Sequence, residues 1–294
     1  MFKYFIFILK FVYLFYEINI KISTQMQRVR KVRRIQRPQQ TTPNSQGPSI
    51  VRKPKNTNSK NPSRKVFVKP NDTRQKTVNR NKHLYYENKK NVSSVEPIWQ
   101  GETVYIIGGG PSLKTFNWNY LAGKKTIAIN KAFYAYPNAD ILYFTDGRFY
   151  GWYKDDIDLF KGKKYTVTPG TVKLDPGVNM LKRGQKLGLS KEKDTLCHGN
   201  NSGYAAINLA YLLGAKRIVL LGYDMGNDGK KSHFHEGYPT NAVSNSIYAN
   251  NFMPAFETLY PILKNSGIEI YNANEKSRLN IFPKISLEKA LSFK

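Results

Sequence analysis

Short apolar segments alternate with helical patterns from about residue 97 to the end of the chain, and this alternation restricts the fold more than any other feature. The segments that we expect to form strands span 103–108, 125–130, 139–146, 164–169, 216–224 and 268–274. The expected helices span 112–123, 202–215, 243–265 and 286–292. Because strands that alternate with helices are joined by right-handed crossovers, residues 96–294 are predicted to form an α/β fold, a Rossmann-like open and mostly parallel sheet flanked by helices.

The helix expected at 202–215 has small and apolar residues on every side, which is typical of a helix buried against a sheet. Ser202 is expected to cap its start and Gly214 its end. Gly267 marks the end of helix 243–265. The strand at 216–224 is apolar enough to lie in the centre of the sheet.

Residues 26–95 have a different composition, rich in Arg, Lys, Asn, Gln, Ser, Thr and Pro. Between residues 28 and 90 there are 19 Lys and Arg, whereas Asp72 and Glu87 are the only acidic residues. Such a segment cannot bury enough apolar surface to offset its ordering entropy, so we expect a disordered basic tail. Its partner would be a polyanion, either nucleic acid or an anionic membrane, unless the tail is a solvated linker with no specific partner.

Residues 1–25 form a separate segment, of which residues 1–20 are strongly apolar and aromatic and are interrupted by Lys10 and Glu17. Its length suits a membrane anchor, and the basic residues that follow would then favour a cytoplasmic C-terminal side. Alternatively, translation starts at Met26 and residues 1–25 are a mis-called extension, or the segment is amphipathic and peripheral. The lone Cys197 fits a reducing compartment. We therefore expect a cytoplasmic protein, at the inner face of a membrane if the segment anchors it.

A glycine-rich loop follows the first expected strand: Gly108, Gly109, Gly110, Pro111 and Ser112. In an open α/β sheet, ligands bind at the carboxyl ends of the strands, and glycines let backbone N–H groups approach phosphate oxygens. The loop lacks the lysine of a Walker motif and the third glycine of the dinucleotide fingerprint. It is either a phosphate-binding loop or a tight turn that needs glycine for its backbone conformation.

Polar residues also follow the other expected strands. They are Asn130, Asp146, Arg148 and, after a further glycine at Gly222, Asp224. Asn130 could bind a base or ribose, Arg148 a phosphate, and either aspartate a ribose hydroxyl or a metal ion. Each residue could equally cap a helix or form a turn. Since all these strand ends should meet at one edge of the sheet, together they predict a ligand cleft.

A second helix start, Asn201-Ser202-Gly203, is expected to face the same edge with its positive end. The loop 229–239 carries His233 and His235, and a loop histidine is a natural general acid or base. A zinc site formed by Cys197, His198, His233 and His235 is a competing interpretation, although the spacing matches no recognised zinc motif. Another competing interpretation is that these are surface histidines without a functional role.

Several motifs follow one another between residues 100 and 294: VYIIGGGPSL, IAINKAF, NNSGYAAINLAYLLGAKRIVLLGYDM, a histidine in a Gly-rich loop, and RLNIFPKISLEKAL. Together they resemble the sialyltransferase-like superfamily. That superfamily includes bacterial lipooligosaccharide sialyltransferases, motility-associated flagellin glycosyltransferases and 6-hydroxymethylpterin diphosphokinases. The resemblance implies that Gly108–Ser112, Asn130 and Ser202-Gly203 hold the CMP part of a CMP-sugar. It also implies that His235 or His233 is the general base, although both lie closer to the Ser-Gly motif than the sialyltransferase base does.

Three functions follow as alternatives. The first is a glycosyltransferase that moves a sugar, such as a nonulosonic acid, from a CMP-activated donor to the hydroxyl of a glycan or protein acceptor, with no tightly bound cofactor and no metal. The second is a diphosphokinase that uses ATP, with Mg²⁺ held by Asp146 or Asp224. The third is a non-catalytic scaffold whose basic tail binds nucleic acid or membrane.

Overall fold

In the part of the chain that the computed structural model describes, eight parallel strands form one open sheet in the order β6-β5-β4-β3-β2-β1-β7-β8. The strands are β1 Thr103–Ile107, β2 Lys125–Ile129, β3 Ile141–Phe144, β4 Lys163–Val167, β5 Val178–Arg183, β6 Thr195–Leu196, β7 Arg217–Leu221 and β8 Glu269–Asn272. The structure describes residues 92–167, 172–226, 233–235, 238 and 244–293. The predicted Rossmann-like α/β fold is therefore confirmed, and the expectations for residues 1–91 lie outside the described part. Within the described ranges, no helix has the length and apolar character needed to cross a bilayer.

The α-helices are α3 Ala132–Ala135, α4 Gly147–Asp158, α5 Ser202–Leu212, α6 Asn245–Ile247, α7 Met253–Asn265 and α8 Leu287–Leu291. Residues 248–252 form a π-helical turn between α6 and α7, so the helix expected at 243–265 is present from 245 onward. Gly267, with φ +73°, follows α7 as predicted. The chain then enters β8.

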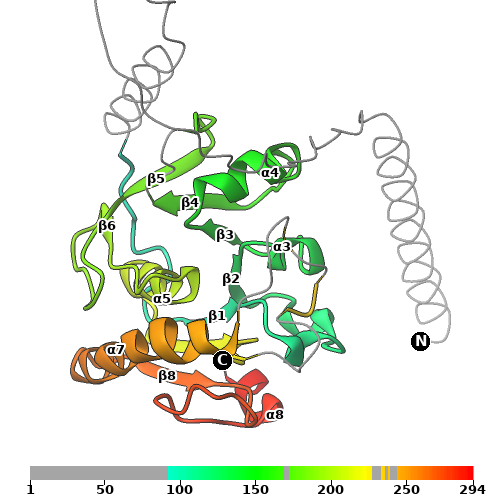
Figure 1. Cartoon of the computed structure of the whole chain (residues 1–294), viewed down its shortest axis with the longest axis vertical. Helices are drawn as coiled ribbons and strands as arrows, with labels where there is room; N and C mark the ends of the chain where they lie inside the picture. The colour runs from blue at the N-terminus through cyan, green and yellow to red at the C-terminus, as the bar shows by residue number, and fades with distance from the viewer. Residues whose placement is uncertain (1–91, 168–171, 227–232, 236–237, 239–243, 294) are drawn as a thin grey trace, which may run out of the picture. The chain divides into compact units, whose positions relative to one another are not determined.

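Alternate residues of each strand point to opposite faces of the sheet, and each face has its own apolar core. On β1, Val104 and Ile106 belong to the core under α5 and α7, whereas Tyr105 and Ile107 belong to the other. That second core is completed by residues of α3, α4 and α8. Figure 1 shows this layering, with α5 and α7 on one side of the strands and α3 on the other. Both faces being covered explains why the central strands β1, β3 and β7 are largely apolar.

The strand order changes direction at β1, because β2 to β6 extend to one side of it and β7 and β8 to the other. Such a switch point leaves a crevice at the carboxyl ends of the central strands. The loops after β1 and β7 meet there. This is the place where the sequence predicts the ligand cleft.

The helix predicted at 112–123 is wrong. The segment forms two short 3-10 turns, Pro111–Leu113 and Trp118–Leu121. Asn117 divides them, because its backbone is extended and its side chain accepts a hydrogen bond from the Asn119 N–H. An Asn side chain that bonds its own backbone competes with a continuous helix.

The start of α5 also differs from the prediction. Asn201, not Ser202, is the N-cap, since its Oδ1 accepts a hydrogen bond of 2.8 Å from the Tyr204 N–H. The predicted glycine at the other end is present, with φ +94° at Gly214. Because Asn201 caps the helix, the Ser202 hydroxyl can form hydrogen bonds with other residues.

Residues 92–95 belong to the fold, although the sequence assigns them to the tail. Val92 forms a bridge with Met180, and the Ser93 N–H donates to the Met180 carbonyl. Val95 is fully buried. The folded domain therefore includes Val92, four residues before the expected boundary.

Candidate functional site

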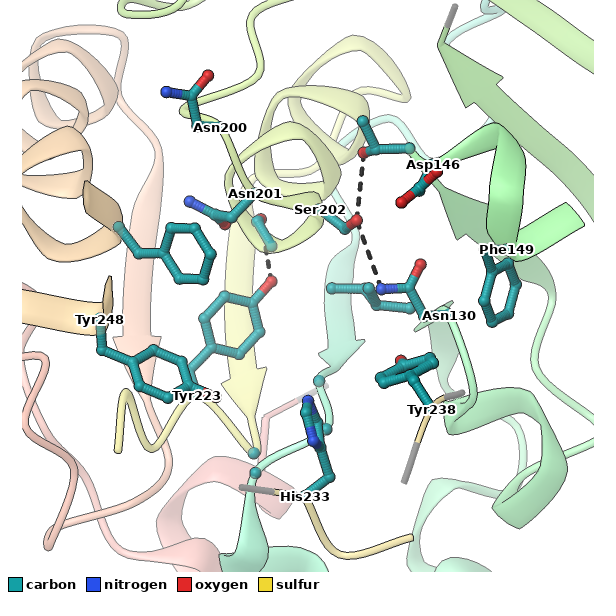
Figure 2. A pocket seen from close by; sticks show the side chains of 18 of the residues that line it. Asn130, Asp146, Phe149, Asn200, Asn201, Ser202, Tyr223, His233, Tyr238 and Tyr248 are labelled. Atoms are coloured by element: carbon teal, nitrogen blue, oxygen red, sulfur yellow. Dashed lines mark hydrogen bonds between the residues drawn. The ribbon is translucent and has the colours of Figure 1, made fainter. Parts of the chain in front are cut away.

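A cavity of about 760 Å³ opens at the carboxyl ends of the strands. Twelve of the predicted site residues line it: Gly108, Gly109, Gly110, Asn130, Asp146, Arg148, Asn201, Ser202, Gly203, Gly222, Asp224 and His233. Pro111, Ser112 and His235 do not. The cavity thus collects residues from the ends of β1, β2, β3 and β7 and from the start of α5, as Figure 2 shows in part.

The glycine loop is packed against two other segments of the chain. A Cβ on Gly110 would lie 2.6 Å from the Gly222 carbonyl oxygen and 2.5 Å from the Asp224 carboxylate. A Cβ on Gly109 would lie 2.8 Å from the His233 ring, and the Gly109 carbonyl accepts a hydrogen bond from the Phe234 N–H. Close approach of neighbouring backbone and side chains therefore explains why the loop is made of glycine.

A carboxylate from the loop after β7 lies at the start of the 3-10 turn that follows the glycine loop. Asp224 accepts hydrogen bonds from the Ser112 N–H at 2.7 Å, the Ser112 Oγ at 2.6 Å and the Asn274 Nδ2 at 2.7 Å. The Ser112 groups that the sequence assigns to a phosphate are thus bound by the protein itself. The loop forms a wall of the cavity, and Ser112 serves to join β1 to β7.

Arg148 and Asp146 likewise bind each other. Arg148 donates to both carboxylate oxygens, with the shortest contact at 2.6 Å, and the Asp146 side chain also accepts from the Arg148 N–H at the start of α4. These hydrogen bonds hold the pKa of Asp146 below its ordinary value. Both aspartates predicted as Mg²⁺ ligands therefore already accept hydrogen bonds from protein donors.

A chain of hydroxyl and amide groups joins three elements at the base of the cavity. Asn130 Nδ2 donates to Ser202 Oγ at 3.4 Å, and Ser202 donates to Thr145 Oγ1 at 3.2 Å (Figure 2). Thr145 in turn contacts the Tyr143 hydroxyl at 3.1 Å. Asn130 Oδ1 is buried, and none of the described residues donates to it. A buried amide oxygen of this kind is an acceptor suited to a ligand N–H or O–H.

Backbone strain is concentrated at the cavity. Among the described residues, Asn130, Asn200 and Met225 have positive φ without being glycine, at 50°, 58° and 52°. All three line the cavity. Such conformations cost about 1–3 kcal/mol each and persist where the surroundings impose them. Their common location supports a functional role for this edge of the sheet.

Of the two candidate histidines, His233 is the one at the cavity. Its ring stacks on that of His235, with centroids 4.9 Å apart and an interplanar angle of 19°. Burial, and to a lesser extent the positive charge of Lys131, lowers the pKa of His233 below its ordinary value. The imidazole is therefore neutral near pH 7, the form that a general base requires.

Aromatic side chains surround this histidine. The Tyr238 ring lies edge-on to His233, with centroids 5.3 Å apart, and near Phe149 at 6.3 Å (Figure 2). Burial raises the pKa of Tyr238 well above its ordinary value, despite hydrogen bonds from Lys131 and Asn130 that lower it. Tyr238 stays protonated at neutral pH and can donate a hydrogen bond. The sequence reasoning missed it, although it lies in the same Gly-rich loop as the two histidines.

Arg183 is another cavity residue that the sequence reasoning missed. It ends β5, a strand that was not predicted. Its Nη2 lies 3.3 Å from Nδ1 of His198, a buried histidine whose pKa is lowered by burial and by Arg183 and Lys186. The run VNML before it alternates weakly in polarity, which was the available signal for a strand.

The competing zinc interpretation is not supported. No three His, Cys, Asp or Glu side chains of the described residues lie close enough together to hold a metal ion. Cys197 and His198 are buried next to α5, whereas His233 and His235 pack on Gly109. Burial raises the pKa of the Cys197 thiol, which makes it a poor ligand and nucleophile.

Comparisons with known proteins found no matching family model, no matching curated protein and no matching solved structure.

Proposed function

We propose that this chain is a glycosyltransferase of the sialyltransferase-like type, which transfers a sugar from a CMP-activated donor to an acceptor hydroxyl. The proposal is carried by one observation: a neutral histidine, His233, shares a cavity with the start of α5 and the unpartnered amide oxygen of Asn130. The cavity volume of about 760 Å³ is within the range of roughly 300–1,000 Å³ typical of sites for small molecules. The resemblance of the motifs supplies the reaction class.

In the proposed reaction, the imidazole of His233 accepts the proton of the acceptor hydroxyl. The acceptor oxygen forms a bond to the anomeric carbon of the donor sugar, while the bond from that carbon to the phosphate oxygen breaks. The electron pair of the broken bond stays on the phosphate of the leaving nucleotide. Backbone N–H groups at the start of α5 offer stabilisation for this charge, because helix N-termini favour anions.

The geometry favours His233 over His235 as the base. His233 lines the cavity, while His235 packs on its ring and against Gly109. A base must come within hydrogen-bonding distance of the proton that it removes. We therefore assign His235 to holding the orientation of His233.

Turnover by His233→Ala and His235→Ala tests this assignment. With a CMP-activated nonulosonic acid as donor, His233→Ala should lower kcat by about 10²–10⁴-fold, the usual contribution of a general base. His235→Ala should lower kcat less, and both variants should bind CMP as the wild type does. Unchanged turnover in both variants would refute the role of this loop, and a large loss in His235→Ala alone would reassign the base.

Ligand-dependent thermal stability tests the reaction class. The wild-type protein should be stabilised by CMP without a metal ion, since bound ligand stabilises the folded state. Stabilisation by ATP only with Mg²⁺ would favour the diphosphokinase reaction instead. No stabilisation by CMP, CTP, ATP or GTP would favour a scaffold without nucleotide-dependent activity.

A further inference from the structure

Arg183 differs in its partners from two nearby cationic side chains, Arg148 and Lys182. Arg148 is bound to Asp146, and Lys182, the residue before Arg183, is bound to Asp194 at 2.5 Å. No carboxylate of the described residues lies within ion-pair distance of Arg183, which is exposed and lines the cavity. A guanidinium without a carboxylate partner retains its donors for an anionic ligand.

His198 holds Arg183 in place. This residue is only 7% exposed, and its Nδ1 is 3.3 Å from Arg183 Nη2 and 3.1 Å from the Asn200 backbone nitrogen. Because both neighbours are N–H donors, Nδ1 carries no proton and accepts from them, so the ring is the neutral tautomer with its proton on Nε2. The buried imidazole thus connects the guanidinium to the backbone at the start of α5.

The backbone around this pair is fixed as well. The Gly184 N–H donates to the Leu196 carbonyl, and the His198 N–H donates to the Gln185 carbonyl. The segment after β5 therefore runs beside the segment that leads into α5. Arg183 and the Asn200–Ser202 start of α5 consequently line the same cavity from adjoining segments. An arginine next to a helix N-terminus is a combination suited to an anion.

We propose that Arg183, positioned by His198, forms a subsite of the cavity that binds an anionic oxygen group of the substrate, either a phosphate or a carboxylate. The subsite deepens the proposed function, and it rests on that function only for the identity of the nucleotide. Its two sources in a CMP-activated nonulosonic acid are the phosphate and the sugar carboxylate. Both present paired oxygens to the fork of guanidinium donors.

Binding measurements with Arg183→Gln test the subsite, with Lys182→Gln as a control that removes the same charge from the neighbouring residue. The probes are cytidine, CMP, CMP-N-acetylneuraminate and inorganic pyrophosphate. Loss of a charge-assisted contact should weaken binding about 10- to 100-fold. If Arg183 binds the phosphate, CMP and CMP-N-acetylneuraminate should weaken alike. If it binds the carboxylate, only the sugar nucleotide should weaken.

Two results would overturn the subsite. One is equal affinity of the wild type and Arg183→Gln for every anionic probe that the wild type binds. The other is an equal loss in Lys182→Gln, which would indicate a general charge effect. Should the wild type bind no cytidine nucleotide, the proposed function fails, but pyrophosphate should still bind in a manner that depends on Arg183. Absence of that binding would refute the subsite too.

Variants of His198 test the positioning role separately. His198→Leu removes the acceptor and should weaken anion binding roughly two- to tenfold, the usual effect of freeing one long side chain. His198→Asn keeps an acceptor near the position of Nδ1 and should restore the affinity. In the His198→Leu background, Arg183→Gln should have a smaller effect than in the wild type. Additive losses, or no rescue by asparagine in a stably folded variant, would refute the coupling of the two residues.

Discussion

Replacing single glycines in the loop after β1 distinguishes packing from ligand binding as the reason for their presence. In Gly110→Ala, the new Cβ would lie 2.6 Å from the Gly222 carbonyl oxygen, a backbone atom that cannot rotate away. The Gly110 backbone, with φ −63° and ψ 149°, is one that alanine adopts freely. The cost therefore comes from the overlap and not from the backbone conformation.

We expect Gly110→Ala to be destabilised by about 1–2 kcal/mol, because overpacking costs about 1–3 kcal/mol and the reduced freedom of the unfolded chain offsets about 0.4–1 kcal/mol. For a domain of this size, that corresponds to a fall of roughly 2–8 °C in Tm. In Gly109→Ala the nearest atoms belong to the His233 side chain, at 2.8 Å. Stability should change little there, while turnover should fall because the base is displaced.

Gly151→Ala is the matched control. Gly151 lies in α4 with nothing within 4 Å of its Cβ position, so the substitution should stabilise the protein by up to about 1 kcal/mol. Thermal melts monitored by circular dichroism, together with CMP affinity, provide the assay. If Gly110→Ala melts at the wild-type temperature but loses CMP affinity, the glycine serves the ligand and the packing argument is wrong.

Three further predictions concern other parts of the chain. Asn201→Ala removes the cap of α5 and should cost about 1 kcal/mol in chemical denaturation, whereas Asn201→Ser should restore most of it. His198 and His233 have lowered pKa values in the folded protein, so the unfolded chain binds protons first as the pH falls. The free energy of unfolding should therefore decrease as the pH drops from roughly 7.5 to 5.5. A urea midpoint that stays constant over this range would contradict the prediction. Deleting residues 1–91 should leave transfer activity intact and abolish the salt-dependent binding of heparin that the basic tail predicts; undiminished heparin binding would place the polyanion site in the folded domain.

The sequence predicted six of the eight strands found among the described residues and missed β5 and β6. The missed strands lie towards the edge of the sheet, where β5 ends in Lys182 and Arg183 and β6 has only two residues. β5 contains the polar residues Asn179, Lys182 and Arg183, and β6 is an edge strand of two residues, so both patterns resemble that of a loop. Missing β5 also meant missing Arg183, because a residue is assigned to a strand end only once the strand is recognised.

The position of the candidate site could be predicted from the sequence, but the hydrogen bonds between its own residues could not. The rule that parallel strand ends meet at one edge was enough to bring Gly110, Asn130 and Asp224 together. Whether Asp224 faces a ligand or Ser112 depends on a contact between residues 112 positions apart. Local sequence carries no information on such a contact, so the two interpretations of the glycine loop separate only in three dimensions.

The position of β1 between β2 and β7 also has a consequence for how the chain is synthesised. One edge of β1 can pair with β2 soon after translation, but its other partner begins at Arg217, 114 residues after Thr103. At usual rates of elongation, the ribosome needs on the order of 10 s to produce that stretch. During this interval a fully buried strand of the finished sheet has an open, apolar edge. The nascent protein therefore exposes an edge that can pair with other chains between the appearance of β1 and that of β7.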